Sequence, residues 1–380
     1  MTSCGSGDGS SGGSSDSSGG SAALSTTSQT LSSNGSGNAQ FNFTVQSDTT
    51  AVQLVASTSA TSITLTSLTG PGGANMLASN VTEVSSALSV QPGGNSFSFP
   101  TLQNSIQAGT YTANYLVQSR IVAGSGQGGA SVNLSVVQKN GSTSSGGTLP
   151  VNVVFVGPTS GDQDTFDSIQ GCVQVWQATF AQANITLDVQ YYNFDGPNTL
   201  PSPATGDPLY AQISAATRPN AINMVIGVDV ANLSGPENED FGTAGGIPGS
   251  ILPGEHSAAA FSILRVAGTD GRFNYSGSGS DQKWQDEIEV GGQVMAFLAG
   301  EYLGMQPAVS FQGDKVIATD RIPDTATCVT EIECENNSEP RDNFMFPRVY
   351  FQPGEGLETY SRSDMTPDQA AFIDESPFVN

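Results

Sequence analysis

Short segments in which apolar and polar residues alternate recur between residues 40 and 139. They cover residues 41–45, 52–56, 63–68, 97–99, 111–117 and 132–137, and glycine- and proline-rich turn signals such as Pro92-Gly93-Gly94 separate them. Alternation places every second side chain on one face of a strand. The pattern predicts a small antiparallel β-sandwich over residues 40–139.

The pattern changes at Val151. Residues 151–156 form a continuous apolar run, which is typical of a buried strand, and helix-start residues follow at 161–165. Further strands are expected at 185–194, 222–230 and 258–264. One apolar stripe at steps of three and four residues predicts a long helix between the first two strands: Phe166, Ile169, Val173, Trp176 and Phe180. A mixed sheet with a helix packed on it is expected, which makes the chain an α+β multidomain protein.

A second long helix is expected from about residue 281 to residue 305, with Gly304 as a natural stop. Two adjacent stripes carry its apolar side chains: Trp284, Ile288, Met295, Leu298, Tyr302 and Met305 on one, and Val290, Val294 and Phe297 with Glu301 on the other. On this pattern alone the segment is a buried helix.

Polar low-complexity sequence flanks the predicted sandwich. Residues 5–39 are almost wholly Gly, Ser, Thr, Asp and Asn, a composition that predicts a disordered tether. Met1-Thr2-Ser3-Cys4 resembles the end of a bacterial lipoprotein signal, which implies lipidation of Cys4, although a chance cysteine is the alternative. The expected organisation is therefore a lipoprotein-type N-terminus and tether at 1–39, a sandwich at 40–139, a linker at 140–149 and a second domain at 150–380.

Charge restricts the partners. Of the net charge of −24, residues up to Pro150 carry only −2, so the second domain is strongly acidic. Such a surface repels nucleic acid and anionic membranes and favours cationic partners. No apolar run approaches the roughly 18 residues of a membrane span. A membrane is therefore expected to be contacted only through a lipid anchor, and the chain is expected to be an outer-membrane or cell-surface lipoprotein, or secreted.

Two of the four cysteines, Cys328 and Cys334, lie close together in a polar segment. Their spacing suits a small disulfide loop and hence an oxidising compartment. Zinc binding by this pair is less favoured because no second Cys or His pair accompanies it. The pattern leaves the pairing of Cys172 open.

The order of segments after residue 150 resembles that of secreted bacterial metzincin peptidases. The matching pieces are a strand and long helix, the turn Gly246-Ile247-Pro248-Gly249 before an edge strand, a helix ending Tyr302-Leu303-Gly304-Met305, and a loop with Asp320 and Asp324-Thr325. Asn343-Phe344-Met345-Phe346-Pro347 is similar to the Met-turn of that family, and residues 365–369 to its last helix. Residues 108–112 weakly resemble a pre-peptidase sandwich. The resemblance implies a metallopeptidase-like fold with Met345 beneath the metal position.

An active metzincin needs the motif HExxHxxGxxH, in which three His side chains hold zinc and the Glu polarises water. Setting Gly304 on the motif glycine puts Phe297, Glu301 and Pro307 at the ligand positions and Leu298 at the general base. The whole chain contains one histidine, His256, which we interpret as a surface residue in a loop. The zinc site is therefore degenerate, and no zinc is expected.

Two functions compete. The first is a catalytically inactive metzincin-like domain that serves as a protein or peptide binding or structural module. The alternative is a peptidase or hydrolase of altered mechanism or altered metal use, with Glu301 as acid or base. No cofactor is expected, with a calcium site as the alternative, and the hydrolase of altered metal use would hold calcium or manganese on carboxylates. The calcium alternative rests on acidic residues that crowd one region: Asp314, Asp320, Asp324, Glu331 and Glu333.

Overall fold

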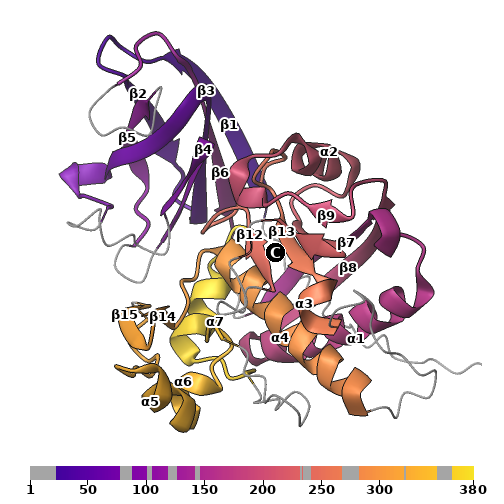
Figure 1. Ribbon diagram of the computed structural model, residues 1–380. Helices are drawn as coiled ribbons and strands as arrows, with labels where there is room; N and C mark the ends of the chain where they lie inside the picture. Colours follow the sequence, from indigo (N-terminus) through magenta and orange to yellow (C-terminus); the bar gives the residue numbers. More distant parts are fainter. Residues whose placement is uncertain are drawn as a thin grey trace, which may run out of the picture.

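The computed structural model describes residues 23–77, 88–100, 105–118, 126–141, 146–231, 233, 241–267, 282–320, 322–348 and 362–380 (Figure 1). The chain is α+β, as expected. We call residues 23–141 the β unit and residues 146–380 the α/β unit. No helix among the described residues is long and apolar enough to cross a membrane.

Six antiparallel strands build the β unit in one hydrogen-bonded sheet of order β1-β6-β3-β5-β2, with β4 paired to β3. The predicted sandwich differs from this in its connectivity, because one long strand, β3, covers two of the predicted segments. Its first part pairs with β4 and β6, and its second part pairs with β5. The strands are β1 (Ala23–Ser32), β2 (Asn38–Val45), β3 (Thr49–Thr69), β4 (Leu88–Phe99), β5 (Gly109–Gln118) and β6 (Ser131–Asn140), and η1 (Pro71–Gly73) follows β3.

The sheet folds over on itself around an aromatic core. Phe99 of β4 packs on Tyr111 of β5 with ring centroids 5.4 Å apart, although these two strands are not paired with each other. Phe43 of β2 stacks on the same tyrosine. The inward positions of the alternating pattern are thus buried between two layers of one continuous sheet, as packing in a sandwich requires.

The predicted tether is wrong for residues 23–39. Ala23–Ser32 is strand β1, which pairs with β6 along its whole length, and β2 begins at Asn38. The side chains of β1 are mostly exposed, so its backbone ladder holds it in place. Hydroxyl contacts add to the ladder: Ser28 Oγ lies 2.9 Å from Ser135 Oγ, and Thr30 donates to Asn133. Cys4 and the rest of residues 1–22 lie outside the described part.

A five-stranded sheet of order β12-β13-β10-β7-β8 forms the centre of the α/β unit. Four strands are parallel, and β12 runs antiparallel at the edge. This edge strand precedes the turn at 246–249, whereas the sequence predicted it after the turn. The strands are β7 (Gly147–Val156), β8 (Ile185–Phe194), β10 (Ile222–Gly227), β12 (Gly242–Ala244) and β13 (Ala259–Ser262), with the short pairs β9 (Thr199–Leu200) with β11 (Asp229–Val230) and β14 (Val309–Gln312) with β15 (Lys315–Thr319).

Helices cover both faces of this sheet. Val151, Val153 and Phe155 of β7 point into the core shared with α1 and α4, whereas Val154 and Val156 point toward α2. This is why β7 reads as a continuous apolar run. The helices are α1 (Gln163–Phe180), α2 (Pro208–Ala216), α3 (Ile263–Ala267), α4 (Gln282–Leu303), α5 (Glu331–Asn336), α6 (Ser338–Arg341) and α7 (Pro367–Asp374), with 3-10 turns η2 (Gly157–Thr159), η3 (Ala181–Ala183) and η4 (Pro203–Thr205).

Two glycines let α1 and α4 approach closely. A Cβ added at Gly291 would lie 2.6 Å from Cys172 Sγ, and one at Gly292 would lie 2.5 Å from the carbonyl oxygen of Cys172. Larger residues there would push the helices apart, because packed interiors leave no such room. This contact fixes α4 against α1 and the sheet.

The two units share an interface in place of the predicted linker at 140–149. Strand β6 ends at Asn140 and β7 already begins at Gly147. Gln53 of β3, only 1% exposed, donates to the carbonyl of Gly249 (2.9 Å) and accepts from the amide of Ile251 (2.8 Å). Lys139 Nζ donates to the carbonyl of Asp374 at 3.0 Å. Buried hydrogen bonds of this kind hold the units together.

Gln53→Leu should lower the free energy of unfolding by about 2–4 kcal/mol, because two buried backbone groups lose their partners at about 1–3 kcal/mol each. Urea denaturation measures the loss. Gln40→Leu on β2 is the matched control, since Gln40 is exposed and its replacement should change stability little. Equal stability of both variants would contradict the structural role of Gln53.

Candidate functional site

The last turn of α4 ends as the sequence predicts. The helix runs to Leu303, and Gly304 has φ +112°, a conformation that favours glycine. The amides of Gly304 and Met305 both reach the carbonyl of Gly300, at 3.1 Å and 2.9 Å. Gly304 thus closes the helix and turns the following segment away from its axis.

Apolar side chains occupy two of the positions that the motif would fill with catalytic groups. Leu298, at the general-base position, is 2% exposed and packs against the edge strand: a Cβ added at Gly242 would lie 2.6 Å from Leu298 Cδ1. Phe297, at the first ligand position, is half-buried against the core of the unit, so its ring is less enclosed than the sequence predicted. Glu301 and Pro307, at the other ligand positions, are also half-buried.

Met345 lies directly beneath this part of α4. Its side chain is fully buried, and a Cβ added at Gly300 would lie 2.4 Å from Met345 Sδ. The Met345 amide donates to Asn343 Oδ1 (2.9 Å), and its carbonyl accepts from Ala308 N (2.8 Å). These bonds fix the turn at Asn343 to Phe346 under the helix. The turn contacts the helix at Gly300, the residue before Glu301.

The edge strand β12 borders the same region. It is the terminal strand of the sheet and pairs with β13 through Thr243 opposite Ala260, whereas no other described strand pairs with its second edge. Hydrogen-bonded pairs alternate along an antiparallel ladder. Because the amide of Gly245 and the carbonyl of Phe241 both bond across to the β13 side, the backbone groups of Gly242 and Ala244 point toward the second edge.

The segment between β12 and β13, residues 245–258, is locked to the end of α4. Tyr302 donates its hydroxyl to the carbonyl of Ser250 (2.6 Å), and Gly249 N donates to the carbonyl of Tyr302 (2.8 Å). Burial raises the pKa of Tyr302, so the hydroxyl remains a donor. The turn at 246–249 thus holds the last turn of α4 in register with the edge strand.

His256 is not the surface residue that the sequence suggested. It is half-buried, and its Nδ1 lies 3.0 Å from the carbonyl oxygen of Pro203. Since a carbonyl only accepts, Nδ1 carries the proton. The ring fits beside two glycines, because a Cβ at Gly94 would lie 3.0 Å from its Cδ2 and one at Gly206 3.1 Å from its Cε1. No local sequence signal predicts this place, since Gly94, Gly206 and His256 are far apart in the chain.

Three of the five acidic residues named as a calcium cluster are engaged elsewhere. Asp324 accepts from the Thr366 hydroxyl and the Asp368 amide at the start of α7, and Glu331 forms an ion pair with Arg348. Glu333 accepts from the amide of Val329. Among the residues that the structure describes, no three His, Cys, Asp or Glu side chains are grouped to hold a metal ion.

Asp320 differs from these, because it is 8% exposed and has no basic partner at its side chain among the described residues. Neither of its carboxylate oxygens makes a hydrogen bond of good geometry. Loss of hydration raises its pKa to about 7, although Thr325, the Ile322 amide and Gln369 stand close enough to limit the rise. The carboxyl group is therefore partly protonated near neutral pH.

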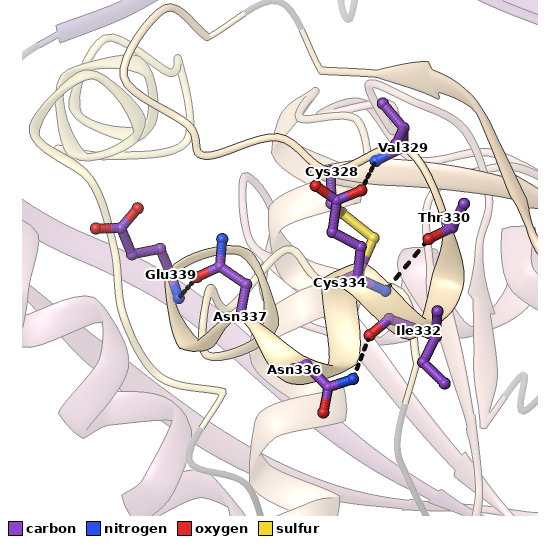
Figure 2. Close-up of a disulfide and its surroundings, with 9 residues drawn as sticks. Cys328, Val329, Thr330, Ile332, Cys334, Asn336, Asn337 and Glu339 are labelled. Carbon is purple, nitrogen blue, oxygen red and sulfur yellow. Dashed lines mark hydrogen bonds between the residues drawn. A yellow bond between two sulfur atoms is a disulfide. The ribbon is translucent and has the colours of Figure 1, made fainter.

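Figure 2 shows the predicted disulfide, and it confirms that Cys328 and Cys334 are bonded. The bond joins the residue before Val329 to the middle of α5, whose first turn Thr330 caps by accepting from Glu333 N. Cys172 is free and buried in α1, and burial raises the pKa of its thiol. It therefore stays an unreactive thiol.

No protein-family model matches the sequence, and no curated protein matches it. Among solved structures, the chain is similar to mature mirolysin from Tannerella forsythia in complex with a cleaved peptide, with 14% identity, a TM-score of 0.37, and coverage of 60% of this chain and 91% of that one. A second match is the catalytic unit of a GH87 α-1,3-glucanase from Streptomyces thermodiastaticus strain HF3-3, with 13% identity, a TM-score of 0.20, and coverage of 57% and 46%. Similarity at this level establishes neither a family nor an activity.

Phe297→Ala should cost about 1–3 kcal/mol of unfolding free energy, because a half-buried ring leaves only part of the usual cavity. Phe180→Ala is the matched comparison, since this fully buried ring should cost about 3–5 kcal/mol. Urea denaturation of both variants measures the difference. An equal loss of unfolding free energy at the two positions would show that Phe297 is a fully enclosed core residue.

Asp320→Asn should be more stable than the wild type at pH 8, and this gain should be absent at pH 4. Because the folded-state pKa is about 7 and the unfolded value about 4, the wild type loses stability as pH rises through that range. The substitution removes this loss and should gain about 2–4 kcal/mol at pH 8. Denaturation at both pH values tests it, and an equal effect at the two would contradict the raised pKa.

Proposed function

We propose that this chain is an exported protein whose α/β unit binds an extended peptide or protein segment without hydrolysing it. The observation that carries the proposal is the set of residues around the end of α4. Leu298 stands at the general-base position of the metzincin pattern, and Phe297, Glu301 and Pro307 stand at the ligand positions. With one histidine in the chain, a three-His zinc site is excluded by composition.

The binding surface is the second edge of β12. The backbone groups of Gly242 and Ala244 face this edge, so an extended segment adds there as a further antiparallel strand. Leu298 on α4 packs against Gly242 of β12. The acidic charge of the unit favours a segment that carries Lys or Arg. The edge is only three residues long, so side-chain contacts must supply much of the affinity.

The same proposal holds that the chain is exported and attached to a membrane through a lipid on Cys4. The Met1 to Cys4 sequence supports lipidation of Cys4, which places the protein on the outer membrane or cell surface, and secretion is the alternative. The disulfide between Cys328 and Cys334 supports an oxidising compartment. A pseudoenzyme that is held outside the cell in this way presents the second edge of β12 to extracellular protein.

Fluorescence polarisation with labelled tryptic casein peptides, which end in Lys or Arg, tests the binding. Ala244→Pro removes the amide that faces the free edge and leaves the ladder to β13 intact, so affinity should fall about five- to tenfold. Thr243→Ala keeps every backbone group and should bind normally. A peptide N-methylated at alternate residues lacks N–H donors for the ladder and should also bind weakly. This peptide tests binding by strand addition without any change in the protein.

Intact casein separates binding from hydrolysis. The proposal expects the substrate to remain uncut after prolonged incubation, as judged by gel electrophoresis. Cleavage that disappears in Glu301→Gln would establish instead the hydrolase of altered mechanism. Equal binding of the normal and N-methylated peptides would contradict strand addition at β12.

A further inference from the structure

A cavity of about 480 Å³ lies where the β unit meets the α/β unit. Its floor is the outer face of the sheet, from β3, β4 and β6. Its opposite wall is the segment from Ser250 to His256, with Ala211 of α2. Both units therefore contribute to it. Its volume falls in the range of small-molecule sites, which favour domain interfaces.

Neutral polar side chains dominate the floor. Ser57, Ser96, Ser135 and Asn133 line it from three different strands. Ser96 is only 7% exposed, and its hydroxyl makes no hydrogen bond to the described part of the protein. A hydroxyl this deeply placed is normally paired. Ser135 and Asn133 also contact Ser28 and Thr30 of β1, so the floor offers a ligand their remaining donor and acceptor positions together with the hydroxyls of Ser57 and Ser96.

The charges around the cavity exclude an anionic ligand. Of the residues that the structure describes, no Lys or Arg lines it, and Glu255 contributes a carboxylate at its exposed rim. The chain as a whole is strongly acidic. His256 has already committed its Nδ1 proton to the carbonyl of Pro203, so it is held in place as part of the wall. A neutral ligand fits this electrostatic setting, and phosphates and carboxylates do not.

Backbone geometry limits how a peptide could bind. Strand β3 is paired on both sides by β4 and β6, and β6 is paired on both sides by β1 and β3. Of the described strands that line the cavity, β4 alone has an unpaired edge, so β3 and β6 offer the main chain of a peptide no ladder to join. Side-chain hydroxyls and amides are the groups that point in, together with small apolar patches from Val55 and Leu252.

We propose that this cavity between the units binds a neutral polyhydroxylated ligand, of the kind presented by a sugar. Its hydroxyls pair with the Ser and Asn side chains of the floor, and its C–H groups lie against Val55 and Leu252. Among the described residues no Phe, Tyr or Trp lines the cavity, so the affinity is weak and depends on the number of hydrogen bonds. The free sugar and the end of a polysaccharide chain share this chemistry.

Saturation-transfer NMR on the full chain tests the site with maltotriose, cellotriose and diacetylchitobiose as probes. At least one should bind, and Ser57→Trp should weaken binding at least tenfold, because the indole fills the mouth of the cavity. Thr44→Trp is the matched control: Thr44 is an exposed strand residue on β2 that does not line the cavity, and this variant should bind as the wild type does. Asn133→Leu removes an amide without filling the space and should weaken binding about three- to tenfold.

Three outcomes would overturn the proposal: no binding of any neutral probe at millimolar concentration, binding that Ser57→Trp leaves unchanged, or a preference for glucose 6-phosphate. Binding of blocked tetra-alanine in place of the sugars would show a peptide site instead. Sedimentation with insoluble cellulose, chitin and starch shows whether the ligand is a free sugar or the end of a polysaccharide. Retention by a polymer that Ser57→Trp abolishes indicates a polysaccharide end, whereas binding of the trisaccharides alone indicates a free sugar.

Discussion

The hydrogen bonds between Gln53 and the segment at 249–251 decide how the molecule is organised. Residues 245–258 connect β12 to β13 without a ladder of their own at this point, so their buried peptide groups need partners from elsewhere. One amide side chain from the β unit supplies both a donor and an acceptor. Tyr302 holds the same residues from the other side. The β unit is therefore part of the framework that orders the segment between β12 and β13.

Small residues explain how α4 keeps its place while the motif positions vary. Gly291 and Gly292 admit α1, Gly300 admits Met345, and Gly304 ends the helix with a positive φ. None of these contacts involves the side chains at 297, 298 or 301. Phe297 and Leu298 add apolar burial at this end of the helix. The position of α4 therefore does not depend on polar side chains at 297 and 298.

Strongly periodic elements were predictable from the sequence, and pairing partners were not. The stripes of α1 and α4 and the apolar run of β7 each record a buried face, so their type and extent follow from local spacing. Strand β1 has no apolar periodicity that would predict it. Its Ser and Thr side chains stay in solvent, and its stability comes from pairing with the edge of β6. Likewise, the merging of two segments into β3 and the placement of His256 beside Gly94 and Gly206 depend on contacts between distant parts of the chain.

Both proposed sites border one segment, which raises the question of coupling between them. Residues 245–258 leave the edge strand at one end and reach the wall of the cavity at Ser250 and His256. A ligand at one site changes affinity at the other only if the segment has two arrangements that the ligands distinguish. Gln53 and Tyr302 bond to it within three consecutive residues, and Gly249 has no room for a side chain beside the Tyr302 ring. Such a pinned segment has one arrangement, so the two sites are expected to bind their ligands independently.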